Sequence, residues 1–255
     1  MRWHYRQFKL KKRLHLEFGG YSDAGVKTRN EDAFTAVLPD NHAARKYKGA
    51  AACIADGVSC SQNAQIASQT AVMNFASDYF STPDFWTVEQ SASQVIGSIN
   101  SWLHQHGVVN QTRVDGYVTT FSALILKSHT THVLHVGDSR IYLLRDGVLR
   151  CLTTDHSYQQ GDQNYLTRAL GIEAGLNLDY KSLSTKLNDR YVLTTDGVHE
   201  HLSLQELTEF VAKETNNLEA LAKEIGQRAL ENGSKDNISC LLVDCLLYTS
   251  DAADE

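Results

Sequence analysis

The sequence predicts a protein of the α+β class, with helices and strands in separate groups. Two helical stretches follow one another at residues 62–79 and 87–103, and strand-like segments follow them between residues 119 and 152. A second helical pair, at residues 203–211 and 218–230, precedes a last strand. A parallel βαβ sheet would instead alternate strand and helix along the chain. The grouping therefore favours antiparallel sheets with helices packed against them.

Apolar side chains at helical spacing identify the helices. In the first stretch one face holds Ala64, Ala67, Ala71, Val72, Phe75 and Tyr79. The second has Thr87 and Gln90 in capping-box spacing and an apolar stripe that we expect in the core: Val88, Ala92, Val95, Ile96, Ile99 and Leu103. Ser203 and Glu206 form another capping box, and Gly233 predicts the end of the last helix.

The strands are predicted by short runs of apolar and β-branched residues. They are residues 14–18, 50–55, 119–126, 132–136, 140–144, 148–152, 191–193 and 238–243. Leu14, Leu16 and Phe18 alternate with polar residues, as in a half-buried strand. Asp146-Gly147 predicts a tight hairpin turn before the strand at 148–152.

Composition narrows the class of protein. A chain of 255 residues with 42% hydrophobic residues can bury a core of its own as one domain. A net charge of -6 argues against a nucleic-acid surface, which needs a basic stripe. No segment approaches the roughly 20 apolar residues of a membrane span, and the basic start at residues 1–13 lacks the apolar centre of a signal peptide.

The cysteines indicate a reducing compartment, and we expect a cytoplasmic protein. Their number is odd and no pair has CxxC spacing. They are Cys53, Cys60, Cys151, Cys240 and Cys245.

Four acidic clusters lie far apart along the chain. They are Asn30-Glu31-Asp32, Asp56-Gly57, Asp196-Gly197 and Asp236-Asn237. The last three follow or interrupt strand-like runs, so folding could bring their carboxylates together. Carboxylates in one place repel each other unless a cation lies between them, and oxygen ligands suit magnesium or manganese. Each Asp taken alone is equally typical of a turn.

These clusters belong to an ordered series of motifs between Ser22 and Val243. The series is Ser22-Asp23-Ala24-Gly25, Asn30-Glu31-Asp32, Ala55-Asp56-Gly57-Val58, Gly116 with Thr119-Thr120, Val136-Gly137-Asp138-Ser139-Arg140, Leu152-Thr153-Thr154-Asp155-His156-Ser157, Thr167-Arg168-Ala169-Leu170-Gly171, Thr195-Asp196-Gly197-Val198 and Gly233-Ser234-Lys235-Asp236-Asn237-Ile238. In this order the chain resembles the metal-dependent protein phosphatases of type 2C, the PPM family. Residues 56–102 resemble the phosphatase half of bacterial proteins in which a serine/threonine kinase domain follows.

The resemblance implies a four-layer αββα sandwich, in which two central antiparallel sheets are flanked by helix pairs, with two Mn²⁺ or Mg²⁺ ions at one end and a third, weaker ion. The implied metal ligands are Asp56, Gly57, Asp196, Asp236 and Asp138, with Glu31 binding through water and Asp32 supporting the cluster. Asp56, Asp196 and Asp236 would be the catalytic set. The implied reaction is hydrolysis of phosphoserine and phosphothreonine esters by a hydroxide that bridges the two ions.

Several positions depart from the family pattern. Lys27 stands where relatives carry a phosphate-binding arginine, and Arg29 is the second candidate for that role. Val58 replaces a histidine that some relatives carry as general acid, which leaves His156 and His199 as candidates or as ordinary structural residues. The segment between His156 and Tyr165 is short for the family's flap.

The sequence also predicts a domain boundary and partners. The phosphatase domain is expected to span residues 1–244, and residues 245–255 resemble a translated sequencing adapter. Expected partners are phosphoprotein substrates and, from the kinase resemblance, a serine/threonine kinase. An alternative is a weak or inactive domain of the same fold that binds phosphoproteins or a kinase. A calcium-stabilised binding module would instead place its carboxylates within one compact loop.

Overall fold

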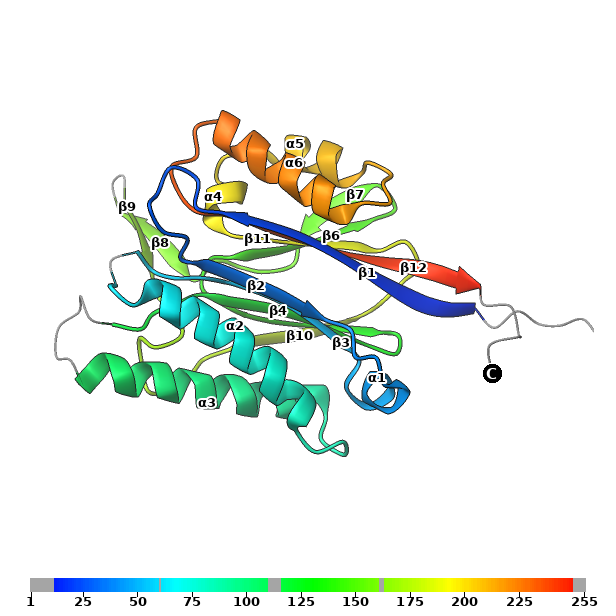
Figure 1. Cartoon of the computed structure of the whole chain (residues 1–255), viewed down its shortest axis with the longest axis horizontal. Coiled ribbons are helices and arrows are strands. Elements are labelled where there is room, and N and C mark those ends of the chain that lie inside the picture. Colours follow the sequence, from blue (N-terminus) through cyan, green and yellow to red (C-terminus); the bar gives the residue numbers. More distant parts are fainter. Residues whose placement is uncertain (1–11, 60, 110–115, 161–162, 250–255) are drawn as a thin grey trace, which may run out of the picture.

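The computed structural model describes residues 12–59, 61–109, 116–160 and 163–249, and shows a sandwich of two sheets between two layers of helices (Figure 1). The basic start at residues 1–11, the end of the chain at residues 250–255 and Cys60 lie outside the described residues.

Two five-stranded sheets form the centre, and every recorded strand pair is antiparallel. The first sheet contains, in order, β1 (Lys12–Asp23), β12 (Ile238–Thr249), β11 (Arg190–Thr194), β6 (Arg140–Arg145) and β7 (Val148–Cys151). The second contains β10 (Asp179–Ser184), β5 (Thr130–Val136), β4 (Phe121–Lys127), β3 (Ala50–Asp56) and β2 (Asp32–Val37). A separate hairpin pairs β8 (Ser157–Gln160) with β9 (Gln163–Leu166).

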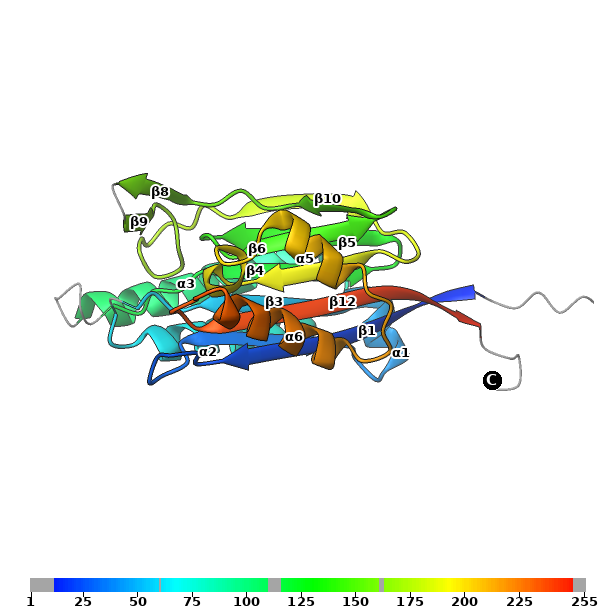
Figure 2. The same ribbon diagram turned by 90° about the horizontal axis from the view of Figure 1, so that it is seen from above.

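Helices cover the outer face of each sheet (Figures 1 and 2). The first sheet carries α5 (Leu204–Val211) and α6 (Leu218–Glu231), with the single turn α4 (Asp196–His199) near its end. The second carries α2 (Ala64–Ser81) and α3 (Val88–Val109), and α1 (His42–Lys48) joins β2 to β3. The predicted α+β class and its four-layer αββα arrangement are therefore confirmed.

The alternation of side chains along the strands builds three apolar cores. Ile54, Leu124 and Leu193 belong to the core between the sheets. Phe75 of α2 and Phe121 of β4 belong to the core between the second sheet and the helices α2 and α3. The core between the first sheet and the helices α5 and α6 includes Val192, Leu207, Ile225 and Leu242. Since each central strand is buried on both faces, the apolar runs at 50–55 and 238–243 show little alternation.

The local signals in the sequence form as predicted. Asp146 and Gly147 both have positive φ, 53° and 76°, as the tight hairpin between β6 and β7 requires. Ser203 and Glu206 make both hydrogen bonds of the capping box at the start of α5. Gly233, at φ 95°, follows the end of α6, where its N–H donates to the Leu230 carbonyl.

Four strands were not predicted, namely β2, β8, β9 and β10. Among the predicted strands, β1 and β12 differ most in length. These strands were expected to span 14–18 and 238–243, but they pair with each other along their whole length, from Lys12 opposite Thr249 to Asp23 opposite Ile238. Cys245 is fully buried in the core between the sheets. The predicted boundary at residue 244 stays a prediction, although the strand runs past it.

Among the described residues, no helix is long and apolar enough to cross a bilayer. Cys53, Cys151, Cys240 and Cys245 are all free thiols.

Candidate active site

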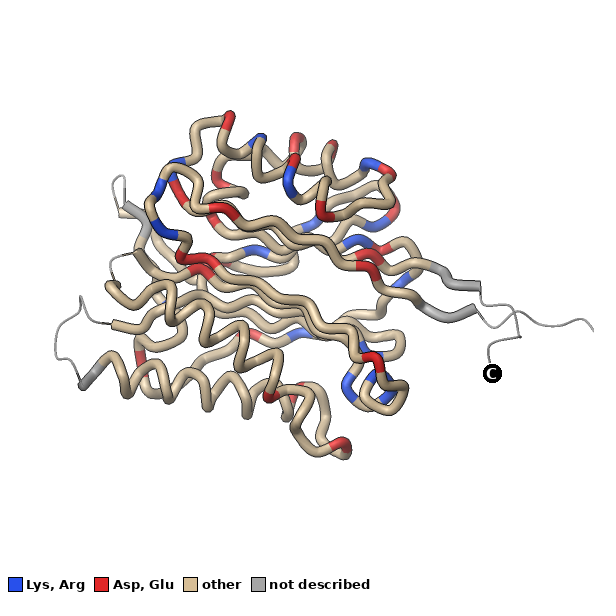
Figure 3. Tube along the Cα trace, viewed as in Figure 1, with Lys and Arg blue, Asp and Glu red and all other residues tan. Residues whose placement is uncertain are grey.

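Carboxylates from both sheets converge at one end of the sandwich. Asp56 ends β3 and lies opposite Asp32, the first residue of β2, in the strand register. Asp196 begins α4 directly after β11, and Asp236 lies just before β12. Asp138 lies in the turn between β5 and β6. In Figure 3, acidic positions gather with basic ones at the end of the sandwich away from the C-terminus. Folding therefore brings the predicted acidic clusters together.

The backbone at Asp56 is fixed from three directions. Its carbonyl accepts hydrogen bonds from the Thr120 N–H and the Thr119 hydroxyl, both at 2.8 Å, and its own N–H donates to Thr120 Oγ1 at 2.9 Å. The next residue, Gly57, packs so closely that a Cβ there would collide with the Ala64 carbonyl. This position therefore has room only for glycine.

Asn237 holds the loop between β1 and β2 against the acidic cluster. Its Oδ1 accepts a hydrogen bond from the Glu31 N–H at 2.9 Å, and its Nδ2 donates to the carbonyls of Ala24 and Arg29 at 3.0 and 2.9 Å. Only 2% of Asn237 is exposed. No local pattern in the sequence assigns a role to Asn237, although it adjoins Asp236. Its amide is the link that brings residues 24–31 to the strand that follows Asp236.

Mutual repulsion and burial make the carboxylates at the base of the cluster reluctant to ionise. Burial raises the pKa of Asp32 to about 7, although hydrogen bonds from Ser239 and Thr195 lower it and the charge of Asp196 raises it. Burial also raises the pKa of Asp56 well above its usual range, and the charges of Asp32 and Asp196 add to this effect.

The carboxylates on the first sheet's side are perturbed for the same reasons. Burial raises the pKa of Asp196 to about 6, with the charges of Asp236 and Glu200 adding to it. Burial, followed by the charge of Asp196, raises the pKa of Asp138 to about 7. The electrostatic energy of the whole cluster would fall if a cation bound to it.

The donor set fits hard divalent cations. Two buried carboxylate oxygens, Asp32 Oδ1 and Asp196 Oδ1, have no hydrogen-bond partner among the described residues. As the side chains stand, no group of three or more His, Cys, Asp or Glu residues in the described ranges is arranged to hold a metal ion. The backbones that carry these carboxylates lie close together, and carboxylates reorient by side-chain rotation, so the orphaned oxygens can turn towards a bound ion. The oxygen-only chemistry matches magnesium or manganese.

Lys27 reaches the acidic cluster. Its Nζ forms an ion pair with Asp236 and donates a hydrogen bond to Ser59 Oγ at 2.8 Å. Burial would lower the pKa of Lys27, but the hydrogen bond and charge of Asp236 outweigh it and raise the pKa. Arg29 is exposed, and its backbone carbonyl is bound by Asn237. Of the two predicted phosphate-binding residues, Lys27 is the one that lies against the carboxylates.

His156 and His199, the candidate general acids, are both engaged in structural contacts. The Nδ1 of His156 accepts a hydrogen bond from the Gly137 N–H at 3.1 Å, its Nε2 contacts Asp179 at 3.0 Å, and only 4% of it is exposed. Burial lowers the pKa of His199 to about 3, so it carries no acidic proton at neutral pH. Neither arrangement suits a general acid. His156 instead fixes Gly137, the residue before Asp138.

Known proteins with similar sequences are phosphatases. The family profile described as protein phosphatase 2C matches residues 20–233. A serine/threonine phosphatase, stp, of Listeria innocua is 28% identical over 250 residues, which cover 91% of this chain and 96% of that protein.

Solved structures share the fold. The serine/threonine phosphatase of S. agalactiae superposes with a TM-score of 0.78 at 23% identity, covering 90% of this chain and 99% of that one. The catalytic domain of the phosphatase PstP, solved in complex with two manganese ions, superposes with a TM-score of 0.75 at 25% identity, covering 92% of this chain and all of that domain.

Proposed function

Because this chain belongs to the protein phosphatase 2C family, we propose that its acidic cluster hydrolyses phosphoserine and phosphothreonine esters in proteins with the help of two Mn²⁺ or Mg²⁺ ions. The observation that carries the proposal is the convergence of buried carboxylates from both sheets, two of which have an unpartnered oxygen. Two divalent ions bound there would supply an activated water molecule as nucleophile and neutralise charge on the phosphoryl group.

The position of each residue in the cluster indicates its role in the proposed reaction. We assign Asp56, the Gly57 carbonyl, Asp196 and Asp236 as the main metal ligands. Their backbones are fixed by strand ends and by the single turn of α4, so the ligands are held before substrate arrives.

The outer positions have lesser roles in this proposal. Asp32 supports the cluster from its buried position, and Glu31 would contact an ion through water. Lys27 would bind the phosphate, because its ammonium group already lies beside Asp236. Asp138 would hold a third, weaker ion with Asp196.

The direct test uses the purified full chain with phosphoserine, phosphothreonine and phosphotyrosine peptides. We expect phosphate release from the first two peptides in manganese, loss of release with chelator, and recovery when manganese is restored. Release that survives exhaustive chelation would overturn the proposal. Metal binding without phosphate release would instead support the inactive phosphoprotein-binding domain.

Replacement of Lys27 tests the phosphate contact. We expect Lys27→Ala to raise KM for a phosphopeptide more than it lowers kcat, because it removes a charge-assisted hydrogen bond worth roughly 1.5 to 3 kcal/mol. Lys27→Arg should preserve or improve affinity, since a guanidinium can make two such bonds. Arg29→Ala is the matched control and should have the smaller effect. If Arg29→Ala raises KM while Lys27→Ala is silent, Arg29 is the phosphate ligand.

Replacement of Asp138 separates the weak third ion from the main pair. We expect Asp138→Ala to lower kcat while calorimetric titration with manganese still shows two ions bound per chain. The charge of Asp196 acts on the Asp138 carboxylate, which places the two side chains close together. Loss of the Asp138 carboxylate should therefore weaken only the third-ion site that it shares with Asp196. A stoichiometry of one ion in this variant would contradict the assignment.

We further propose phosphoproteins of the cytoplasm as the substrates. The free state of the four described cysteines supports a reducing compartment. A serine/threonine kinase, fused or separate, stays a proposed partner on the resemblance of residues 56–102 alone. Co-purification of tagged full chain from cells, followed by kinase detection, tests that partner.

A further inference from the structure

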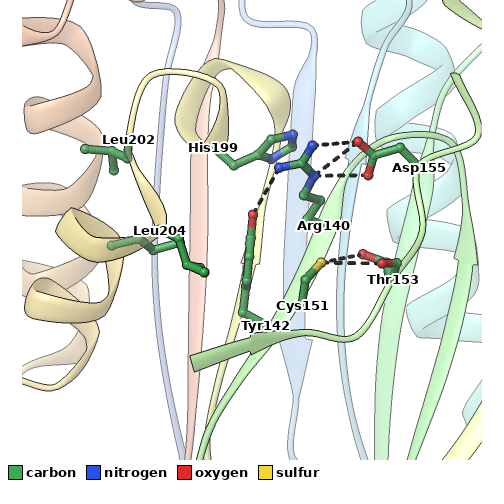
Figure 4. Close-up of a pocket in the computed structure, with 9 residues that line it drawn as sticks. Arg140, Tyr142, Cys151, Thr153, Asp155, His199, Leu202 and Leu204 are labelled. Atoms are coloured by element: carbon green, nitrogen blue, oxygen red, sulfur yellow. Dashed lines mark hydrogen bonds and ion pairs between the residues drawn. The ribbon is translucent and has the colours of Figure 1, made fainter. Parts of the chain in front are cut away.

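A pocket of about 350 Å³ lies between the first sheet and the segment that carries α4 and α5 (Figure 4). Its residues come from β6, β7, the segment after β7, α4 and α5. Leu202, Leu204 and Leu207 form an apolar wall, and Tyr142, Cys151 and Thr153 line the sheet side. Arg140, Asp155 and His199 complete the lining. Arg140 comes two residues after Asp138 in the chain, and His199 comes three residues after Asp196.

Two polar groups in this pocket have unused hydrogen-bonding capacity. His199 is only 7% exposed, and its Nδ1 contacts Thr194 Oγ1 at 3.0 Å, but its Nε2 has no partner among the described residues. Arg140 donates three hydrogen bonds to Asp155 through Nε and Nη2, whereas its Nη1 makes only a 3.5 Å contact with the Tyr142 hydroxyl. Figure 4 shows the two side chains next to each other. A ligand with a carboxylate and an N–H group would satisfy both.

The same pocket presents a thiol. Cys151 is exposed, and its sulfur lies 3.4 Å from the Thr153 carbonyl. The other described cysteines, Cys53, Cys240 and Cys245, are buried. Within the described ranges, Cys151 is therefore the thiol that a reagent in solution can reach.

We propose that Cys151 is a modification site, at which a small carboxylate-bearing thiol forms a mixed disulfide that occupies this pocket and slows the enzyme. The Cys151 thiolate attacks one sulfur of a low-molecular-weight disulfide. That S–S bond breaks as the new one forms, and the departing thiolate takes up the proton that Cys151 lost. The low-molecular-weight disulfide is the oxidant, so the exchange is balanced.

The adduct would act on the cluster through two short connections. In α4, His199 and Asp196 are ends of one helical turn, in which the Glu200 N–H donates to the Asp196 carbonyl at 2.9 Å. Arg140 continues directly from the turn that carries Asp138. A group held against His199 and Arg140 would shift both carboxylates. This consequence for activity rests on the proposed phosphatase function.

Oxidised glutathione is the probe for the experiment on the full chain. We expect peptide mapping to find one glutathione on Cys151, manganese-dependent phosphate release to fall about fivefold or more, and dithiothreitol to restore it. Cys151→Ser should keep basal activity and be insensitive to the probe. Leu204→Trp, which fills the rim of the pocket, should slow adduct formation. Cystamine, which lacks a carboxylate, should react more slowly than oxidised glutathione.

Three results would overturn the inference. The first is modification at Cys60 instead of Cys151, and the second is a Cys151 adduct with unchanged activity. The third is an adduct that forms equally fast with cystamine and with oxidised glutathione, and equally fast in Leu204→Trp and in the unchanged chain. Thermal melting of the adduct distinguishes inhibition from unfolding, because inhibition through the pocket leaves the melting transition in place. If unmodified protein releases no phosphate in manganese, the proposed function fails, whereas mapping still tests the modification.

Discussion

Asp196→Asn and Asp236→Asn are each expected to lower kcat by roughly a thousandfold or more at saturating manganese, because each removes a charge that holds a divalent ion. Both carboxylates lie at the end of the first sheet, one beginning α4 and the other preceding β12. Steady-state kinetics with a phosphothreonine peptide measures the loss. Full activity in either variant would exclude the two-ion mechanism.

The melting temperature of each variant in chelator shows whether its loss of activity comes from impaired catalysis or from unfolding. Because burial and like charge raise the folded-state pKa of Asp196 to about 6, the folded state binds more protons than the unfolded state between about pH 4 and 6. The metal-free protein should therefore gain stability as pH falls from 7 towards 5. Asp196→Asn removes the repulsion at pH 7, so its metal-free melting temperature should equal or exceed that of the unchanged chain.

Asn237→Ala is expected to be the most damaging change outside the carboxylates. It removes three hydrogen bonds that fasten residues 24–31, each worth about 1 kcal/mol, and leaves their backbone partners unsatisfied. The melting temperature should fall by roughly 6 to 12 °C. Turnover should fall as well, because Lys27 and Glu31 lie on the released loop.

The matched control for this change is Asn232→Ala. Asn232 is exposed, and its side chain donates to the His201 carbonyl at 2.8 Å and not to the loop between β1 and β2. It should behave as the unchanged chain in both measurements. An Asn237→Ala protein with normal stability and turnover would show that the loop is held by other contacts.

The sequence predicted elements well where the signal is local. Helical periodicity identified the faces of α2 and α3, and Asp146-Gly147 identified its hairpin, because these patterns depend on residues a few positions apart. The sequence did not predict β2, β10 or the hairpin of β8 and β9. The residues of β2, β8 and β10 are mostly half-buried or exposed, so they lack an apolar pattern. The full length of β1 and β12 depends on their pairing with each other, which no local pattern encodes.

The site shows the same division. The acidic motifs were visible because turn-forming pairs such as Asp56-Gly57 stand out beside apolar runs. The role of Asn237 was not predicted because its side chain donates hydrogen bonds to backbone carbonyls more than 200 positions away in the sequence. For His156 and His199 the sequence left a general-acid role and an ordinary structural role both open, because it does not show the burial and the hydrogen bonds of their rings.

The pairing of β1 with β12 also determines when the enzyme can become active during synthesis. Tyr21 pairs with Cys240, and β12 is the strand that joins β1 to its sheet. At usual translation rates, on the order of 10 to 40 s separates the emergence of the two segments from the ribosome. Until then β1 has an unpaired, aggregation-prone edge, and Asp236 has not reached the cluster. A nascent chain arrested before residue 236 should therefore release no phosphate, however much of the sandwich has already formed.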